Sequence, residues 1–261
     1  MPSIMSSPHS DGAEDHPAHW FGFRPVAADE KAPLVRAVFE SVASRYDLMN
    51  DLMSGGIHRL WKAAMVDWLM PQPGWRLVDV AGGTGDIAFR ILDRIAGRGE
   101  VVVLDLTPAM LETGRDRALD RGAAGDLLWV AGDAEALPLE DCSMDAYTIA
   151  FGLRNVTGIE TALAEARRVL KPGGRFLCLE FSRVVLPVFD RLYDLYSFAV
   201  LPALGGLVAG DSASYRYLVE SIRRFPPQPE LASLMQTAGL ERVAWRNLTG
   251  GIAALHSGWR L

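Results

Sequence analysis

One segment constrains the fold of this chain more than any other: residues 77–92 read LVDVAGGTGDIAFRIL. The apolar residues before the glycines suit a central parallel strand, and Gly83 and Gly85 allow a ligand to approach the backbone closely. After the glycines, apolar side chains recur at helical spacing, at Ile87, Ala88, Ile91 and Leu92. The sequence therefore predicts a buried strand, a glycine turn and an opening helix, a unit that binds a nucleoside-containing cofactor.

Strands and helices alternate along the rest of the chain. We expect strands at 75–81, 100–106, 127–133, 144–151 and 175–181, and helices at 33–45, 57–69, 86–96, 108–121 and 158–170. This rhythm is typical of a parallel sheet with right-handed crossovers. Near the C-terminus, two strand-like segments flank Gly250-Gly251, a connection too short for a parallel crossover but suited to a hairpin. We therefore expect an antiparallel last strand.

Two kinds of cofactor fit the glycine turn. Residues 83–88 satisfy the G-x-G-x-x-G/A pattern of dinucleotide-binding folds, and Asp105 ends the next strand, where a ribose-binding acid is expected. However, Asp79 stands within the first strand, and the sequence GDAEALP follows the third strand at 132–138. This layout resembles class I methyltransferases, which use S-adenosylmethionine (SAM). In that family the first acid supports the glycine loop, the second binds the ribose hydroxyls, and the acid after strand three, here Asp133, lies near the adenine.

The resemblance implies an α/β fold of the Rossmann-like, class I methyltransferase type. Its sheet has seven strands, mostly parallel with an antiparallel last strand, and helices on both faces. The predicted hairpin around Gly250-Gly251 favours this fold, because a dinucleotide-binding fold normally keeps its strands parallel. Topology thus favours SAM over a nicotinamide dinucleotide.

Length and charge limit the domain organisation and the partners. At 261 residues the chain has room for one domain, expected at 31–261, preceded by a flexible tail at 1–30 that lacks hydrophobic periodicity. The net charge of −6 disfavours nucleic acid, whose binding relies on basic surface. The two cysteines, Cys142 and Cys178, have the spacing of neither a metal site nor a disulfide framework. We expect no metal and a reducing, cytoplasmic environment.

The loop after the fourth strand of the predicted sheet should carry the chemistry. In open α/β sheets ligands lie beyond the carboxyl ends of the strands, which places residues 151–156, FGLRNV, beside cofactor and acceptor. Residues 157–160 form a plausible capping box that starts the next helix. Arg154 and Asn155 are then held just before a helix. A surface ion pair for Arg154 and a helix cap for Asn155 are the structural alternatives.

Two longer motifs make the resemblance specific. YDLMNDLMSGGIHRLW at 46–61 and RVLKPGGRFLCLEFS at 168–182 resemble the two signatures of the ubiquinone/menaquinone biosynthesis C-methyltransferases, and FGLRNV between them is also typical of that family. The resemblance covers roughly residues 35–261. It implies transfer of a methyl group from SAM to a ring carbon of a polyprenylated benzoquinol or of demethylmenaquinol.

Carried over by position, the resemblance implies cofactor contacts from residues around the glycine turn and after the next two strands: Asp79, Gly83, Thr84, Gly85, Asp105, Asp133 and Ala134. One position departs from the family, which often has serine before FGLRN, whereas this chain has Ala150. We expect a backbone group or water to replace the lost hydroxyl contact.

The proposed chemistry suggests roles for several polar residues. The guanidinium of Arg154 is expected to stabilise a developing phenolate, and Asn155 to orient the same oxygen. His58 is a natural proton acceptor, although it borders an apolar helical stripe and suits a packing role as well. Tyr46 is expected either to close over the methyl donor or to anchor the N-terminal helix.

An apolar segment is expected to shelter the lipid end of the acceptor. Residues 195–209, LYSFAVLPALGGLVA, carry no charge but are too short to cross a bilayer, so we expect a lid-like insertion near 187–217, with an ordinary packed helix as the alternative. Tyr196 is a candidate for the ring pocket. The partners to consider are the quinol, a peripheral membrane contact at the inner face, a quinone-biosynthesis complex and a homodimer. Rival functions are methylation of another aromatic or lipid acceptor, or a non-catalytic SAM-binding scaffold.

Overall fold

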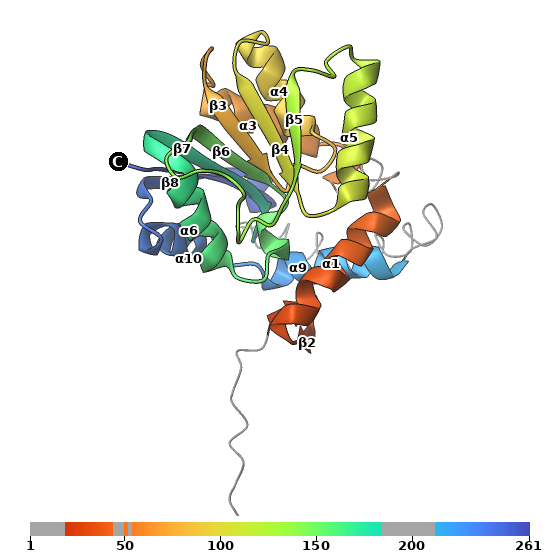
Figure 1. Cartoon of the computed structure of the whole chain (residues 1–261). Coiled ribbons are helices and arrows are strands. Elements are labelled where there is room, and N and C mark those ends of the chain that lie inside the picture. Colours follow the sequence, from red (N-terminus) through yellow and green to blue (C-terminus); the bar gives the residue numbers. More distant parts are fainter. Residues whose placement is uncertain (1–18, 44–49, 52–53, 184–211) are drawn as a thin grey trace, which may run out of the picture.

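A seven-stranded sheet forms the centre of the protein (Figure 1). The computed structural model describes residues 19–43, 50–51, 54–183 and 212–261. The strand order is β5-β4-β3-β6-β7-β9-β8. The strands are β3 (Arg76–Val80), β4 (Glu100–Asp105), β5 (Leu127–Ala131), β6 (Met144–Ala150), β7 (Leu170–Phe181), β8 (Glu241–Leu248) and β9 (Ala253–Trp259).

The pairing of these strands confirms the predicted class. Strands β5, β4, β3, β6 and β7 pair with one another in parallel, whereas β9 runs antiparallel to both of its neighbours, β7 and β8. The last strand is therefore antiparallel, as expected, and it lies between β7 and β8 rather than at the edge of the sheet. The chain order reverses between β3 and β6, which creates a switch point for ligand binding at their carboxyl ends.

Helices cover both faces of the sheet, because successive side chains of the central strands point to opposite faces. Leu77 packs with α3 (His58–Leu69) and α4 (Asp86–Ile95) in one core, whereas Val78 packs with α6 (Ile159–Val169) and α10 (Gln228–Thr237) in the other. Burial on both faces explains the continuous apolar runs of these strands. Helix α5 (Pro108–Asp120) packs beside β4 and β5.

The N-terminal boundary was predicted incorrectly. Residues 19–30, assigned to the tail, form a hairpin of β1 (His19–Phe21) and β2 (Arg24–Val26), followed by α1 (Ala28–Val42). The helix begins five residues before Pro33 because the Glu30 carboxylate accepts a hydrogen bond from the backbone N–H of Ala27 and caps its start. Residues 1–18 lie outside the described residues.

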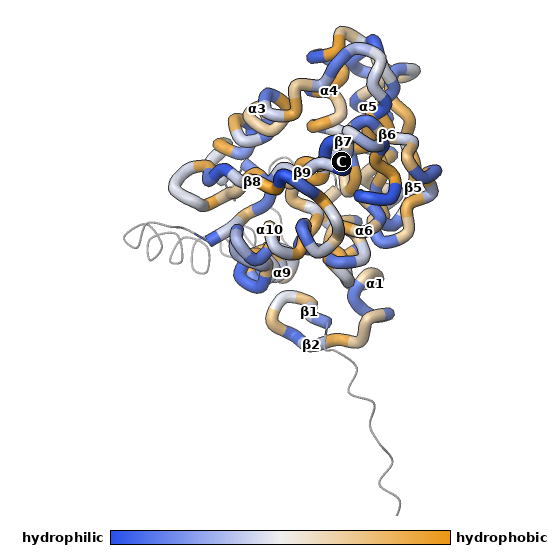
Figure 2. The backbone as a smooth tube through the Cα atoms, turned by 90° about the vertical axis from the view of Figure 1, so that its left-hand side faces the viewer, coloured by the Kyte–Doolittle hydropathy of each residue, from blue (hydrophilic) through white to orange (hydrophobic). Residues whose placement is uncertain are grey.

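The hairpin is held by a helix nearly two hundred residues further along the chain. The Phe21 ring stacks on Tyr217 of α9 (Ser212–Arg224) with centroids 4.2 Å apart, and the Arg224 guanidinium lies over the Trp20 ring. Glu220 on the same helix accepts a hydrogen bond from the backbone of Phe23. Both views place the hairpin at the same end of the molecule as α1 and α9 (Figure 1 and Figure 2).

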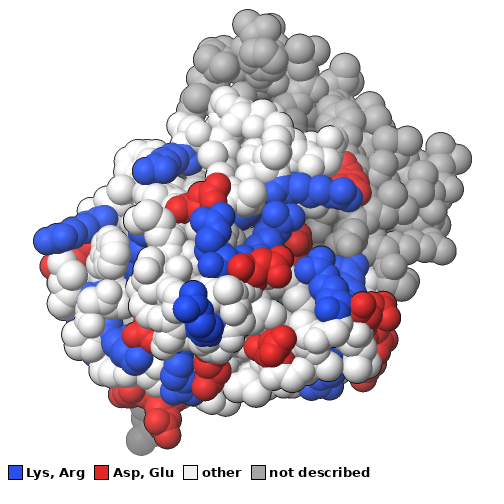
Figure 3. Space-filling model, turned by 90° about the horizontal axis from the view of Figure 1, so that it is seen from above, with Lys and Arg blue, Asp and Glu red and all other residues white. Residues whose placement is uncertain are grey.

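The predicted apolar insertion falls mostly on residues 184–211, outside the described residues, whereas its end, 212–217, belongs to α9. Within the described part, no helix is both long and apolar enough to cross a membrane. Acidic and basic side chains are interspersed over the face seen in Figure 3. Exposed ion pairs among the described residues include Arg36 with Glu40 and Arg94 with Asp67.

Candidate active site

A cavity opens beyond the carboxyl ends of β3, β4, β5 and β6, where the switch point predicts a ligand. It encloses about 710 Å³, part of it open to solvent. Its walls come from the turns after these strands and from α1: Ala32, Val35, Phe39, Ala81, Gly83, Leu104, Asp105, Leu106, Thr107, Met110, Gly132, Asp133, Ala134, Glu135, Phe151, Gly152, Asn155, Val156 and Thr157. Most of this lining is apolar or backbone, with a few convergent polar groups, which is the usual composition of a small-molecule site.

Asp105 organises the floor of this cavity at the end of β4. Its carboxylate accepts two backbone hydrogen bonds at 2.8 Å, from the N–H of Gly83 and from the N–H of Thr107. Burial raises the pKa of the Asp105 carboxyl, and these two hydrogen bonds oppose the shift. The carboxylate thus ties the glycine turn to the turn after β4, and its remaining lone pairs can accept hydroxyl protons.

The glycine turn separates residues that face the cavity from residues that pack behind it. Gly83 lines the cavity and has a φ of +55°. Gly85, also expected to contact the cofactor, does not line it. A Cβ on Gly85 would lie 2.8 Å from the Trp129 ring, and its φ is +83°, so this glycine permits close packing at the start of α4.

The turn after β5 supplies another wall. Asp133 and Ala134, both predicted to contact the cofactor, line the cavity, and Asp133 accepts a hydrogen bond from the N–H of Glu135. The Glu135 carboxylate in turn accepts hydrogen bonds from the backbone N–H groups of Thr157 and Gly158, at 2.6 and 3.0 Å. The start of α6 is therefore held by Glu135, and the predicted capping box at 157–160 is wrong.

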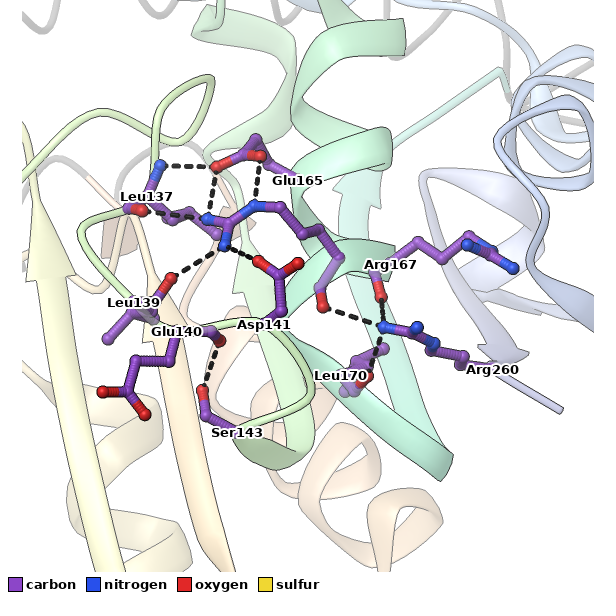
Figure 4. A network of polar contacts seen from close by, with 10 residues as sticks. Leu137, Leu139, Glu140, Asp141, Ser143, Glu165, Arg167, Leu170 and Arg260 are labelled. Atoms are coloured by element: carbon purple, nitrogen blue, oxygen red, sulfur yellow. Dashed lines mark hydrogen bonds and ion pairs between the residues drawn. The ribbon is translucent and has the colours of Figure 1, made fainter.

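The continuation of this turn is fastened to α6 by a polar network (Figure 4). Arg168 donates hydrogen bonds to the carboxylates of Glu165 and Asp141 and to the carbonyl oxygens of Leu137 and Leu139. Glu165 also accepts a hydrogen bond from the N–H of Leu137. The first residue of the RVLKPGG motif thus has a structural role: it fixes the segment that follows Asp133.

Arg154 lies in the expected loop, but its side chain does not face the cavity, where it was predicted to stabilise an acceptor oxygen. It lies in the short helix η2 (Leu153–Asn155), and its Nη1 donates to Glu180 Oε2 at 2.8 Å and to the carbonyl oxygen of Phe151 at 2.7 Å. The side chains of Arg154 and Glu180 are 3% and 1% exposed, and Arg154 does not line the cavity. Because Glu180 neutralises the guanidinium, a direct contact between Arg154 and an acceptor oxygen is not supported. The surface ion pair, considered as the alternative, is in fact a buried one.

Asn155 does face the cavity, as expected. Its Oδ1 accepts a hydrogen bond from the hydroxyl of Tyr217 at 3.0 Å, and its Nδ2 lies 3.4 Å from the carbonyl oxygen of Phe151. Sequence reasoning did not assign Tyr217 to the site. The contact links the cavity wall to α9.

Helix α1 was not assigned to the site either, yet Ala32, Val35 and Phe39 form one wall of the cavity. Lys31 from the same helix donates to the carbonyl oxygen of Val156 at 2.5 Å. Burial lowers the pKa of Lys31, and the negative charge of Glu135 opposes this effect. An apolar helical stripe that contacts a loop after β6 leaves no local pattern by which to recognise it as a cavity wall.

Comparison with known proteins agrees with this arrangement. Residues 25–260 match the model of the ubiE/COQ5 methyltransferase family. The chain belongs to the ubiE/COQ5 methyltransferase family. It is 58% identical over 252 residues to the ubiquinone/menaquinone biosynthesis C-methyltransferase UbiE of Brucella anthropi, covering 96% of each chain. The same identity and coverage of this chain hold for UbiE of Brucella abortus strain S19, with 94% of that protein covered.

Solved structures share the fold at low identity. A SAM-dependent methyltransferase of Thermotoga maritima, described as a possible histamine N-methyltransferase, has a TM-score of 0.63 and 22% identity, with 87% of this chain and all of that chain covered. The [4+2]-cyclase SpnF has a TM-score of 0.65 and 16% identity, with 88% of this chain and 97% of that chain covered. Because one of these neighbours is a cyclase, the fold alone does not fix the reaction of a ubiE/COQ5 family member.

A second, smaller cavity of about 300 Å³ adjoins the first and shares Ala81 with it. It is lined by Lys62, Asp79, Ala81, Gly82, Thr84, Asp86, Ile87 and Ala150. Two predicted cofactor residues, Asp79 and Thr84, thus face this cavity rather than the larger one. Thr84 is buried, and its hydroxyl accepts a hydrogen bond from Arg117 at 2.8 Å.

Among the three predicted substrate residues, His58 is the one that lies within the described part of the chain. His58 is buried at the start of α3, where its Nδ1 lies 2.9 Å from the Ser54 hydroxyl, and it lines neither cavity. Burial and the charge of Lys62 lower its pKa, while Asp51 opposes the shift. The packing role therefore fits His58 better. Tyr46 and Tyr196 lie outside the described residues.

Proposed function

We propose that this protein transfers a methyl group from SAM to a ring carbon of a polyprenylated benzoquinol or demethylmenaquinol. The observation that carries the proposal is the 58% identity, over 96% of the chain, to proteins named for C-methylation in ubiquinone and menaquinone biosynthesis. The larger cavity supports it, because it joins an acid at the end of β4 to an apolar interior. A cytoplasmic location belongs to the same proposal.

The residues of this cavity fit the nucleoside half of SAM. Asp105 is buried, fixed by two backbone N–H groups, and retains acceptor capacity for ribose hydroxyls. Ala134 and Asp133 offer an apolar surface and a polar edge for the adenine. Gly83 lets the turn approach the ligand. Bound there, SAM supplies an electrophilic methyl group, which needs alignment with the attacking carbon more than it needs further activation.

The acceptor must become electron-rich before its carbon attacks. Ionising a phenol-like hydroxyl with a pKa of about 10 costs roughly 4 kcal/mol at pH 7. Asn155 is a polar side chain that lines the cavity from the loop after β6, and it orients the acceptor oxygen. Arg154 acts as a positioning residue: it clamps the carbonyl oxygen of Phe151 against Glu180 and so fixes the loop that carries Asn155.

The direct test is to incubate the pure protein with isotopically labelled SAM and reduced quinone precursors and to analyse the products by mass. A labelled methyl group on the quinol ring is expected. Label on another aromatic or lipid acceptor alone would favour the broader methyltransferase function. SAM binding without transfer to any quinol would favour a non-catalytic scaffold, and binding of a nicotinamide dinucleotide instead of SAM would overturn the proposal.

The apolar acceptor suggests how the protein obtains its substrate. A polyprenyl chain partitions into membranes, so peripheral contact with a bilayer is part of the proposal. Co-sedimentation with lipid vesicles tests that contact, and light scattering distinguishes a monomer from a homodimer. Co-purification with other quinone-biosynthesis enzymes tests a complex.

A further inference from the structure

An aromatic side chain is exposed at the tip of the N-terminal hairpin. Phe21 pairs with Arg24 across the two strands, so Gly22 and Phe23 form the two-residue turn between them. The turn is fixed, because Gly22 has a φ of +60° and the N–H of Phe23 donates to Glu220 at 3.1 Å. Phe23 itself is nevertheless 48% exposed. A single exposed ring is ordinary on a protein surface, so its surroundings decide what it can bind.

Exposed arginines surround this ring. Arg24 follows it directly in the chain, and Arg224 packs on the hairpin, with its guanidinium over a tryptophan ring of β1. Arg216 lies on the same helix, α9, one turn before Glu220 and on the same face. The Glu220 carboxylate is directed at the turn, where it accepts the hydrogen bond from Phe23. These arginines outnumber Glu220 around the tip, although the whole chain carries a net charge of −6.

The hairpin tip lies at the end of the molecule that carries the larger cavity. At the open end of the hairpin, His19 Nδ1 is 3.2 Å from the carbonyl oxygen of Thr157, a residue of the cavity wall. Helix α1 begins two residues after the hairpin ends and forms another wall. Both ribbon views show the hairpin as the outermost described element at this end (Figure 1 and Figure 2). The acids that begin α1, Asp29 and Glu30, follow the open end of the hairpin rather than its tip.

We propose that the hairpin tip, formed by Phe23 with Arg24, Arg216 and Arg224, docks the protein on a bilayer that contains anionic lipids. The Phe23 ring enters the boundary between head groups and acyl chains, where apolar side chains are buried. The arginines bind the lipid phosphates, whose charge and shape complement a guanidinium. The inference rests on the proposed function, because a polyprenylated acceptor resides in the bilayer. Docking at this tip brings α1 and the larger cavity to the surface that holds the acceptor.

The size of the tip predicts weak and reversible docking. Each cation close to an anionic membrane surface raises the affinity about fivefold. Burial of the exposed part of one phenylalanine ring adds a factor of roughly the same size. The electrostatic part depends on salt, because the screening length falls from about 10 Å at 0.1 M to about 3 Å at 1 M ionic strength. Vesicle binding that disappears at high salt is therefore expected.

The experiment measures co-sedimentation of the full chain with phosphatidylcholine vesicles, with and without phosphatidylglycerol. Wild type should bind the mixed vesicles more tightly, and Phe23→Ser and Arg24→Gln should each weaken that binding about fivefold. The matched controls are Leu119→Ser and Arg98→Gln, which remove an exposed apolar side chain and an exposed cation. Leu119 ends α5 and Arg98 precedes β4, so both lie at the opposite edge of the sheet, and neither change should affect binding. An unchanged melting temperature shows that each variant is folded.

Turnover separates docking from catalysis. With a long-chain acceptor in mixed vesicles, Phe23→Ser should be several-fold slower than wild type, whereas both should methylate a short-chain acceptor in solution equally fast. Equal vesicle affinity in wild type and both tip variants, equal losses in the controls, or equal affinity for both kinds of vesicle would overturn the proposal. So would intact vesicle binding combined with lost affinity for another quinone-biosynthesis enzyme, which would make the tip a protein contact. If wild type methylates neither acceptor, the proposed function fails, while the vesicle measurement still decides the docking site.

Discussion

Glu180 and Arg154 form an ion pair in the interior of the protein, with Oε2 and Nη1 2.8 Å apart and both side chains almost completely buried. The pair joins β7 to the loop after β6, because Glu180 also accepts a hydrogen bond from the backbone N–H of Arg154. Removing one partner of such a pair leaves an uncompensated charge in a region that water cannot reach.

We therefore expect Arg154→Met and Glu180→Ala each to lower the free energy of unfolding by about 3–5 kcal/mol, as measured by urea denaturation. The double variant should lose less than the sum of the two single variants, because each change removes the same interaction. Glu100→Ala is a suitable control, since it breaks an ion pair of the same length, with Arg76, on the exposed surface. That change should cost no more than about 1 kcal/mol. Strictly additive losses would argue against a coupled pair.

The Arg154→Met variant also tests whether Arg154 positions the loop that carries Asn155 or contributes to cofactor binding. If Arg154 fixes the loop that carries Asn155, Arg154→Met should retain affinity for S-adenosylhomocysteine (SAH), which SAM becomes when it loses its methyl group, while turnover falls strongly. Both are measured under conditions in which the variant is folded. Unchanged turnover would contradict the positioning role.

Asp105 should control cofactor affinity. Asp105→Asn replaces one acceptor oxygen with an amide that faces the backbone N–H of Gly83 or of Thr107. We expect SAH binding to weaken by about 1–3 kcal/mol, measured by calorimetry. The exposed Asp120 at the end of α5 provides a charge-matched control, Asp120→Asn, whose affinity should equal that of wild type. Full affinity in Asp105→Asn would exclude this carboxylate from the nucleoside site.

Sequence patterns predicted those parts of the molecule in which chemistry and position are local. The strand before Gly83, Asp105 at the end of the next strand, and the hairpin at Gly250-Gly251 each combine a short pattern with a topological rule. Their positions in the structure agree with those expectations. The turn after β5 was predictable in the same way, because Asp133 comes shortly after the end of its strand.

Contacts that depend on the order of strands were not visible in the sequence. Glu180 meets Arg154 because β6 and β7 are parallel neighbours with Ala150 opposite Leu179, a register that no local motif specifies. The hairpin at 19–26 was also missed. Its three-residue strands are too short to show an alternating pattern, and it packs against α9, which is far away in the sequence. Glu135 replaced the predicted capping box because its carboxylate reaches the start of α6 from a different loop.

Tyr217 should affect catalysis more than binding. Tyr217→Phe removes the hydroxyl that donates to Asn155 Oδ1 but keeps the ring that stacks on Phe21. We expect turnover to fall several-fold, while SAH affinity and the melting temperature change little, because the apolar contacts of the ring remain. Tyr215→Phe on the same helix is the matched control. A loss of equal size in both variants would indicate a general effect of α9 rather than orientation of Asn155.

Asp79 should make the free energy of unfolding fall as the pH rises from about 4 to 7. Burial raises the pKa of its carboxyl to about 7, although the Thr148 hydrogen bond and the charge of Lys62 oppose the shift. The unfolded chain ionises near pH 3.9, so the carboxyl is disfavoured in the folded state once the pH exceeds that value. Its contribution to stability is therefore greatest below about pH 4 and falls by about 4 kcal/mol as the pH rises to about 7.

The measurement is urea unfolding between pH 4 and 8 for wild type and Asp79→Asn, because subtracting the two profiles removes the titration of all other groups. The difference should slope downward for wild type between pH 4 and 7 and then level off. Parallel profiles for the two proteins would contradict the prediction, because they would show that the pKa of the Asp79 carboxyl is the same in the folded and the unfolded chain.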